Sequence, residues 1–269
     1  WSLIEEVQNN KDIKHPVVNK VLKYYNYSKG LEIHYDADLP SRSGLGSSSS
    51  FTIGFLNAFY NLINKKIDKK ILAKDSIFVE QILLKELGGV QDQIQIANGG
   101  FNIISINKKG EYNIYNKIDI KKLKNLKKYL LLFYTGVQRH SSAVTEITLQ
   151  KLNSKAKNIE KIYQIAKEAK KILLSKKSNL EELGILMDES WRMKRDIHKN
   201  ISNSEIDMAY NLAKKNGAIG GKILGSGGGG HFLLFAKPEN HKKIIKSLKN
   251  FTNINFDFDN EGSKIIFKN

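Results

Sequence analysis

Residues 40–50 read Pro40-Ser41-Arg42-Ser43-Gly44-Leu45-Gly46-Ser47-Ser48-Ser49-Ser50, and they lead directly into the apolar segment 51–60. Glycine lets the backbone approach a ligand closely, and the first turn of a helix presents unpaired N–H groups at the positive end of its dipole. Serine hydroxyls add donors to the same small volume. The stretch therefore predicts a phosphate-binding loop, with a plain Ser-rich cap or linker as the structural alternative.

The segment before this loop, residues 30–39, alternates apolar and polar side chains. Such alternation predicts a half-buried strand. A strand, a glycine loop and a helix in this order form the local context that a phosphate site needs.

A second glycine cluster, residues 225–230, follows Lys222 and precedes the apolar run 231–235. Gly225, Gly227 and Gly230 match the spacing G-x-G-x-x-G, but that fingerprint must open a helix, and a strand-like run follows here. The sequence also lacks the Gly-Lys-Ser/Thr of a Walker A loop and the serine–glycine spacing of a nucleophile elbow. These common nucleotide and hydrolase motifs are therefore excluded.

A third element lies between the two loops, where Gln91-Asp92-Gln93 stands ahead of Gly99-Gly100 and Glu80 lies on the preceding predicted helix. In wording, order and spacing, the three elements together resemble the GHMP kinases, such as galactokinase, homoserine kinase and mevalonate kinase. Within that superfamily, residues 91–93, 133–136 and 201–203 are most similar to the bacterial D-glycero-D-manno-heptose 7-phosphate kinases. The likeness runs from about Lys14 to the C-terminus.

The periodicity of the whole chain predicts an α+β fold. We place a domain boundary at the lysine-rich connector 121–128, which gives domains 1–124 and 125–269. The predicted helices span residues 16–25, 49–64, 69–87, 141–174, 179–195, 204–216 and 239–250. The predicted strands span residues 101–106, 112–118, 129–134, 221–224, 231–236 and 263–267.

The resemblance implies the two-domain GHMP kinase fold. Its N-terminal, ATP-binding domain is like ribosomal protein S5 domain 2, its C-terminal domain is ferredoxin-like, and the active site lies in the cleft between them. Family members begin with two or three strands and a Gly-Gly-Gly-(Thr/Ser)-Asp segment that holds sugar hydroxyls. No such segment precedes Trp1 in this sequence, so we expect a first domain without its first strands, either as a fragment or by loss.

Composition narrows the class of protein. The chain of 269 residues has no cysteine, and its six histidines have no metal-ligand spacing, which excludes disulfides and zinc sites. Lysine and arginine number 44 against 27 acidic residues, but the excess is nearly all lysine spread over helix faces, unlike a nucleic-acid interface. Without a long apolar run or an export signal we expect a cytoplasmic protein with no membrane partner, either a monomer or a homodimer.

The resemblance also implies roles for residues around the first loop. Gly44, Leu45, Gly46, Ser47, Ser48 and Ser49 would bind the ATP phosphates. Ser48 and Glu80 would hold Mg²⁺, and Asp92 would act as general base. The alternatives are a solvated helix glutamate for Glu80 and a helix N-cap for Asp92.

On the acceptor side, Gly225, Ser226, Gly227 and Gly228 would shape the substrate site, with Ser226 standing where most family members have alanine. For a sugar with a remote phosphate, Arg139 and Arg192 are candidate ligands of that phosphate, and Trp191 is a candidate surface for the sugar ring. Solvated helix charges beside a core tryptophan are the structural alternative.

The expected function is transfer of the ATP γ-phosphoryl to the anomeric hydroxyl of D-glycero-D-manno-heptose 7-phosphate, for nucleotide-heptose and surface glycan synthesis. One alternative is a GHMP kinase for a plain sugar or an isoprenoid alcohol. Two others are a basic nucleic-acid-binding protein and a catalytically dead paralogue.

Overall fold

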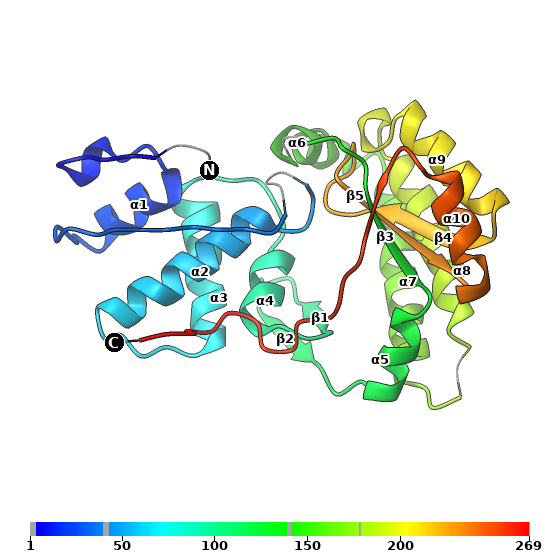
Figure 1. Ribbon diagram of the computed structural model, residues 1–269, viewed down its shortest axis with the longest axis horizontal. Coiled ribbons are helices and arrows are strands. Elements are labelled where there is room, and N and C mark those ends of the chain that lie inside the picture. The colour runs from blue at the N-terminus through cyan, green and yellow to red at the C-terminus, as the bar shows by residue number, and fades with distance from the viewer. Residues whose placement is uncertain (1–3, 40–42, 139–140, 178, 269) are drawn as a thin grey trace. The chain divides into compact units, whose positions relative to one another are not determined.

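The computed structural model describes residues 4–39, 43–138, 141–177 and 179–268. The chain divides into two compact units (Figure 1). Unit 1 comprises Trp1–Ser41, Gly46–Gly100 and Asp259–Asn269, and unit 2 comprises Arg42–Leu45 and Phe101–Phe258. The chain therefore leaves unit 1 after Gly100, earlier than the predicted boundary at 124/125, and its C-terminal end returns to unit 1. The phosphate loop itself passes from unit 2 to unit 1 between Leu45 and Gly46.

Unit 1 is built from α1 (Pro16–Tyr24), α2 (Ser47–Leu62), α3 (Lys69–Ile77) and α4 (Gln91–Asn98), after a short 3₁₀ turn, η1 (Asn10–Asp12). A π-helical segment, η2 (Phe78–Leu83), continues α3. Pro16 starts α1 at a position where its missing N–H costs nothing. The buried apolar residues of these helices form the core of the unit: Val17, Val18, Val21, Leu22, Ile53, Phe55, Leu56, Phe59, Tyr60, Leu72, Ala73, Val79, Ile94 and Ala97.

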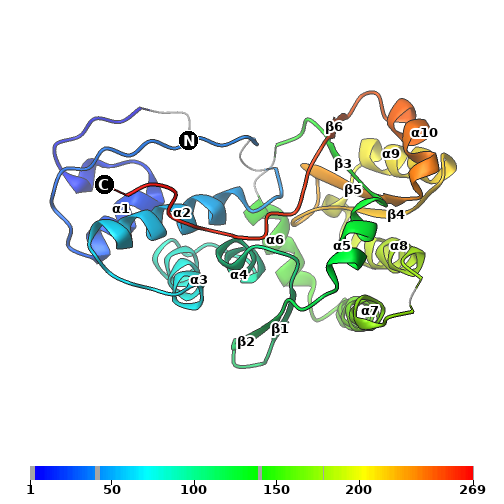
Figure 2. The same ribbon diagram turned by 60° about the horizontal axis from the view of Figure 1, so that its bottom comes forward.

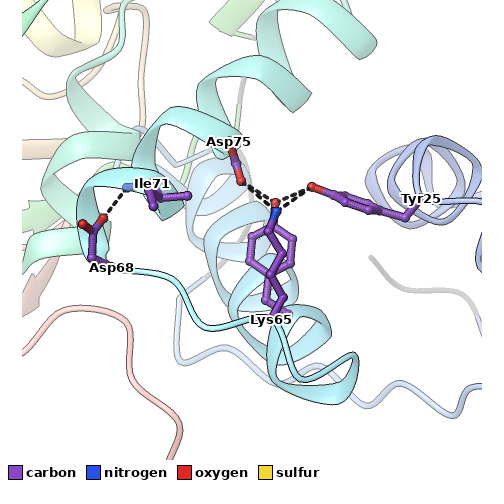
Figure 3. A network of polar contacts seen from close by, with 6 residues as sticks. Tyr25, Lys65, Asp68, Ile71 and Asp75 are labelled. Carbon is purple, nitrogen blue, oxygen red and sulfur yellow. Dashed lines mark hydrogen bonds and ion pairs between the residues drawn. The ribbon is translucent and has the colours of Figure 1, made fainter.

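A polar network ties three of these helices together (Figure 3). The Tyr60 hydroxyl donates to Asp75 at 2.6 Å and lies 2.8 Å from the Tyr25 hydroxyl. The Lys65 ammonium lies 3.8 Å from Asp75 and 4.2 Å from the centre of the Tyr60 ring. Asp68 caps α3 by accepting the Ile71 N–H at 2.7 Å. Burial and the hydrogen bond to Asp75 raise the pKa of Tyr60, so its hydroxyl stays a donor.

Two predicted strands are absent from the described part of unit 1. Residues 30–37 and 264–268 have no regular secondary structure, and both predictions were wrong. Alternation identifies a two-faced segment, but a strand also needs a neighbour for its N–H and C=O groups. Accordingly Leu31, Ile33 and Tyr35 are exposed. The C-terminal segment instead attaches to α4, since the Ser263 N–H donates to the Ile96 carbonyl at 3.1 Å.

Unit 2 contains a hairpin and a four-stranded sheet. The hairpin pairs β1 (Ile103–Ile106) with β2 (Tyr112–Tyr115) around a turn at residues 108–110. The sheet has the order β4-β5-β3-β6, from β3 (Leu130–Tyr134), β4 (Ala218–Ile223), β5 (His231–Ala236) and β6 (Thr252–Ile254). All its pairs are antiparallel. In chain order, with helices after β3 and β5, this is the ferredoxin-like arrangement.

Helices cover both faces of this sheet (Figure 2). These are α5 (Ile120–Lys127), α6 (Ser141–Lys151), α7 (Ala156–Leu174), α8 (Glu181–Arg195), α9 (Ser204–Lys215) and α10 (His241–Ser247), with short turns η3 (Lys199–Ile201) and η4 (Pro238–Asn240). Because successive strand residues point to opposite faces, Phe232 and Leu234 join the cluster with α9 and α10, whereas Phe235 joins the cluster with α5 and α8.

Periodicity located most elements but missed three. The lysine-rich connector forms α5, capped by Asp119, and the segment at 91–98 forms α4. The strand β6 has only three residues, too few for a pattern. The segment 141–174, predicted as one helix, forms two helices, because a turn between Lys151 and Ala156 interrupts it. In the described residues no helix combines the length and apolar character that crossing a bilayer requires.

Candidate active site

The phosphate loop ends in a glycine that starts helix α2. Gly46, at φ +72°, precedes the helix, and its carbonyl accepts the Ser50 N–H at 2.8 Å. No described side chain caps this helix end, because Gly46 has none to offer. The first amides of α2 therefore point along the helix dipole toward any anion at the loop.

Glu80 is buried behind this helix start, at 4% exposure. It lies in the π-helical segment η2, an irregularity common at functional sites. Its Oε2 accepts from the Ser49 hydroxyl at 3.0 Å and from the Gln93 amide, whereas Oε1 is buried without a hydrogen-bond partner among the described residues. Burial raises the pKa of Glu80, and the hydrogen bonds from Gln93 and Ser49 partly oppose that rise.

The surroundings of Asp92 differ from those of Glu80. It lies in the first turn of α4, keeps solvent-exposed surface, and makes no hydrogen bond or ion pair within the described part of the chain. A Cβ built on Gly46 would lie 3.2 Å from Asp92 Oδ2, so the carboxylate abuts the phosphate loop where only glycine leaves it room. Partial desolvation raises the pKa of Asp92.

The predicted magnesium pair is arranged differently from expectation. Ser48 is exposed, and the hydroxyl that reaches Glu80 belongs to Ser49. No group of three or more His, Cys, Asp or Glu that could hold a metal lies in the described residues. Mg²⁺ in phosphoryl-transfer sites needs only one or two carboxylates together with phosphates and waters. The unpartnered Glu80 Oε1 beside the helix start fits that requirement.

The sequence predicted no role for Gln93 or Thr52, two neighbours of Glu80. Gln93 is buried and donates to Glu80, while Asp92 beside it faces the loop. The Thr52 hydroxyl donates to the Ser48 carbonyl at 3.1 Å and lies close enough to Glu80 to lower the pKa of that carboxyl. One signal was available, because Thr52 follows Ser49 by three residues and lies on the same helix face.

In unit 2, hydrogen bonds to the backbone and a side chain of neighbouring residues hold the glycine cluster of residues 225–230. The Gly228 N–H donates to the Ile201 carbonyl at 2.7 Å, and the Lys194 ammonium donates to the Gly225 carbonyl at 2.6 Å. Lys222 precedes the cluster on β4, opposite Leu233. Its ammonium makes no hydrogen bond or ion pair with any of the described residues, and burial lowers its pKa. An unneutralised cation beside this loop favours an anionic ligand.

The other basic candidates have defined surroundings. Arg192 pairs with Asp188 at 2.9 Å and its side chain is 58% exposed. Trp191 is fully buried in the core of unit 2, so it offers no surface to a sugar ring and that expectation was wrong. Burying the large apolar surface of a tryptophan in a core stabilises the fold more than leaving it at the surface. Arg139 and residues 40–42 lie outside the described residues.

The class of protein follows from the family models. The chain matches the model "GHMP kinases N terminal domain" over residues 12–100 and the model "GHMP kinases C terminal" over residues 166–253. The chain belongs to the GHMP kinase family. The expected two-domain α+β fold is confirmed, and the protein is an ATP-dependent phosphotransferase with an alcohol group as acceptor.

Individual relatives of the chain are kinases of sugars and of mevalonate. The chain is 30% identical over 263 residues to the D-glycero-alpha-D-manno-heptose 7-phosphate kinase of Campylobacter jejuni, covering 94% of this chain and 76% of that protein. It is 29% identical over 242 residues to the mevalonate kinase of Methanocaldococcus jannaschii, covering 86% and 70%. Among solved structures, a putative sugar kinase from Campylobacter jejuni matches at 26% identity with a TM-score of 0.71, covering 92% and 72%.

Proposed function

We propose that this kinase transfers the γ-phosphoryl of ATP to the anomeric hydroxyl of D-glycero-D-manno-heptose 7-phosphate, for nucleotide-heptose and surface glycan synthesis. The observation behind the proposal is the exposed, unpaired Asp92 carboxylate against Gly46 of the phosphate loop. The heptose 7-phosphate kinase of Campylobacter jejuni, 30% identical to this chain, supports the choice of acceptor.

In this proposal Asp92 is the general base. Its carboxylate accepts the proton of the acceptor hydroxyl or holds that hydroxyl in line with the γ-phosphorus. Two properties suit it for the role. Its oxygens have no competing partner among the described residues, and desolvation raises its pKa, which makes it a stronger base than an ordinary aspartate.

The residues Gly44–Ser49 bind the α- and β-phosphates through backbone N–H groups, hydroxyls and the dipole of α2. Ser48 and Glu80 are the residues that hold Mg²⁺, and Ser49 orients the Glu80 carboxylate. Bound Mg²⁺ supplies neutralisation of the charge on the phosphate oxygens. The buried Glu80 Oε1 without a partner supports this assignment.

On the acceptor side, residues 225–228 shape the sugar site in this proposal, and Lys222, Arg139 or Arg192 binds the remote phosphate. Lys222 is a buried cation without a counter-charge among the described residues. Arg192 would exchange its ion pair with Asp188 for the phosphate. A charge-assisted contact of this kind is worth about 1.5–3 kcal/mol.

A panel of acceptors tests the proposal: heptose 7-phosphate, the unphosphorylated heptose, galactose and mevalonate, each with ATP and Mg²⁺. We expect kcat/KM to be highest for heptose 7-phosphate, with the new phosphate on the anomeric oxygen by ³¹P NMR. The alanine variant of whichever of Arg139, Arg192 and Lys222 binds the remote phosphate should raise KM for that sugar by roughly ten- to a hundredfold and leave KM for ATP unchanged. Lys161→Ala, which removes the exposed ion pair of Lys161 with Glu189 on α7 and α8, serves as the control.

The second candidate is a GHMP kinase for a plain sugar or an isoprenoid alcohol. It is favoured by relatives of nearly equal identity, the mevalonate kinase at 29% and a galactokinase of Clostridium perfringens at 27%. Turnover of galactose or mevalonate, without turnover of any phosphorylated sugar, would replace the first proposal by this one.

A further inference from the structure

His231 is the first residue of β5 and follows the last glycine of the cluster directly. Its side chain is fully buried. The carbonyl of Ser43, in the segment 43–45 of unit 2, lies 3.0 Å from the His231 backbone nitrogen and 2.9 Å from its Nδ1. One carbonyl at the start of the phosphate loop thus meets two nitrogens of one residue at the end of the glycine cluster.

The geometry assigns the tautomer of this imidazole. A carbonyl oxygen only accepts, so Nδ1 carries the proton and donates it to Ser43. The other nitrogen, Nε2, is buried without a hydrogen-bond partner among the described residues, as is the Ser43 hydroxyl. The Tyr134 ring, 5.1 Å from the imidazole centre, packs against His231. The ring is therefore held by packing and by the Ser43 carbonyl.

Gly230 brings the two backbones into contact. At φ +89°, it would place a Cβ 2.2 Å from the Ser43 oxygen, so no other residue allows this approach. Thr135 fixes Gly230 in turn, because its hydroxyl donates to the Gly230 carbonyl at 2.9 Å and its N–H donates to the same oxygen at 3.0 Å. The Ser43 carbonyl therefore rests on a rigid support from β3 and β5.

We propose that His231 is a positioning residue for ATP: its Nδ1–H holds Ser43 and thereby sets the position of Gly44 and Leu45 in the phosphate loop. The proposal rests on the assignment of Gly44–Ser49 to the ATP phosphates. Small displacements of phosphate-binding backbone are costly, because donors placed about 1 Å away from the ligand lose most of their contribution. His231 acts through Ser43 and touches no reacting atom in this proposal.

Three variants test the role of Nδ1. Asparagine places an amide N–H close to the position of Nδ1, glutamine places one near Nε2, and leucine has no donor. We expect His231→Leu and His231→Gln to raise KM for ATP roughly tenfold, with a much smaller change in KM for the acceptor. His231→Asn should stay within about threefold of the wild type. His241→Asn is the matched control, since His241 also contacts a carbonyl, that of Ala236, at 3.2 Å.

These variants distinguish a role of His231 in positioning the phosphate loop from a role in the stability of the fold alone. Equal ATP KM values for the leucine and asparagine variants, each measured on folded protein, would overturn the proposal. If the variants do not fold, ¹⁵N-histidine NMR of the wild-type protein decides: protonated Nδ1 and bare Nε2 at His231 support the proposal, and the opposite tautomer overturns it. The dissociation constant of ATP, measured without acceptor, should change in the same way as its KM. A wrong acceptor therefore leaves this test valid, whereas a wild type that binds no ATP refutes the assignment of the phosphate loop.

Discussion

Glu80 and Asp92 are two carboxylates of the same unit, and desolvation raises the pKa of both. Glu80 is buried, with one oxygen bonded to Ser49 and Gln93. Asp92 is exposed and unpaired within the described residues, with Gly46 against it. Two pKa shifts in the same direction therefore have different chemical meanings. A fixed carboxylate with one unpartnered oxygen suits a cation, whereas an unpaired, accessible one suits proton transfer.

The largest effect is expected at Asp92. Asp92→Asn should lower kcat by roughly 10² or more while ATP affinity changes only a few-fold, because a base acts on the transition state. The wild-type rate should fall as pH drops through the raised Asp92 pKa, and this acid limb should be missing from the residual activity of the variant. Asp68→Asn, which keeps the α3 cap, is the control. An unchanged kcat would remove Asp92 from the mechanism.

Glu80→Gln should separate activity from stability. We expect kcat/KM to fall roughly ten- to a hundredfold, the scale of damage to a metal-site residue. Since the folded-state pKa of Glu80 is raised, its contribution to stability is fully present below the ordinary value of 4.5 and is lost as pH rises through the folded-state pKa. The glutamine side chain stays neutral and does not lose this stability. At neutral pH the variant should therefore have a higher Tm than the wild type, by about 2–4 °C for each kcal/mol of added unfolding free energy.

Thermal melts from pH 4 to 8 measure this difference, which should widen as pH rises. Glu86→Gln is the matched control, because partial desolvation also raises the pKa of Glu86, but this side chain is largely exposed to solvent and has no role in the proposed metal site, so its loss should leave kcat/KM unchanged. A Glu80→Gln variant with lower stability and full activity would make Glu80 a structural residue only.

Gly46→Ala tests the contact between the loop and Asp92. The substitution puts alanine at φ +72°, a left-handed conformation that costs about 1–2 kcal/mol, and sets its Cβ against Asp92 Oδ2 and Ile96 Cδ1. We expect KM for ATP to rise about tenfold and the thermal shift induced by ATP to shrink accordingly. Gly54→Ala, in the same helix with open space around it, should be neutral or stabilising. A full ATP-induced shift in Gly46→Ala would mean that the loop does not bind phosphate.

The smallest effect on rate is expected at Gln93. Gln93→Leu removes a donor to Glu80 and leaves its buried carboxylate less satisfied, which should destabilise the fold by about 1–3 kcal/mol. Because Ser49 still orients Glu80, we expect kcat/KM to fall by less than about fivefold. Gln81→Leu removes a comparable but exposed hydrogen bond to Gly88 and should change neither quantity. A loss of rate as large as that of Asp92→Asn would move Gln93 into the catalytic group.

Prediction from sequence succeeded where the signal is local. The spacing of apolar residues within one element predicted the helices α1, α2 and α9 and the boundaries of β5. It failed at residues 30–39 and 263–267, because a strand exists only with a paired neighbour. It failed again at Trp191, because one tryptophan on a helix can face a core or a ligand, and only the sheet packed against α8 decides between them.

By itself, the sequence determined the two glycine loops, the Asp-Gln element and hence the family, since glycine runs and short motifs express backbone requirements within a few residues. The packing of whole elements, in contrast, fixes the contact of Glu80 with Ser49 rather than Ser48, 31 residues away in the chain, and the contact of His231 with Ser43, 188 residues away. Contacts at such separations depend on how whole elements pack, and one slipped residue on a helix or strand would exchange every partner.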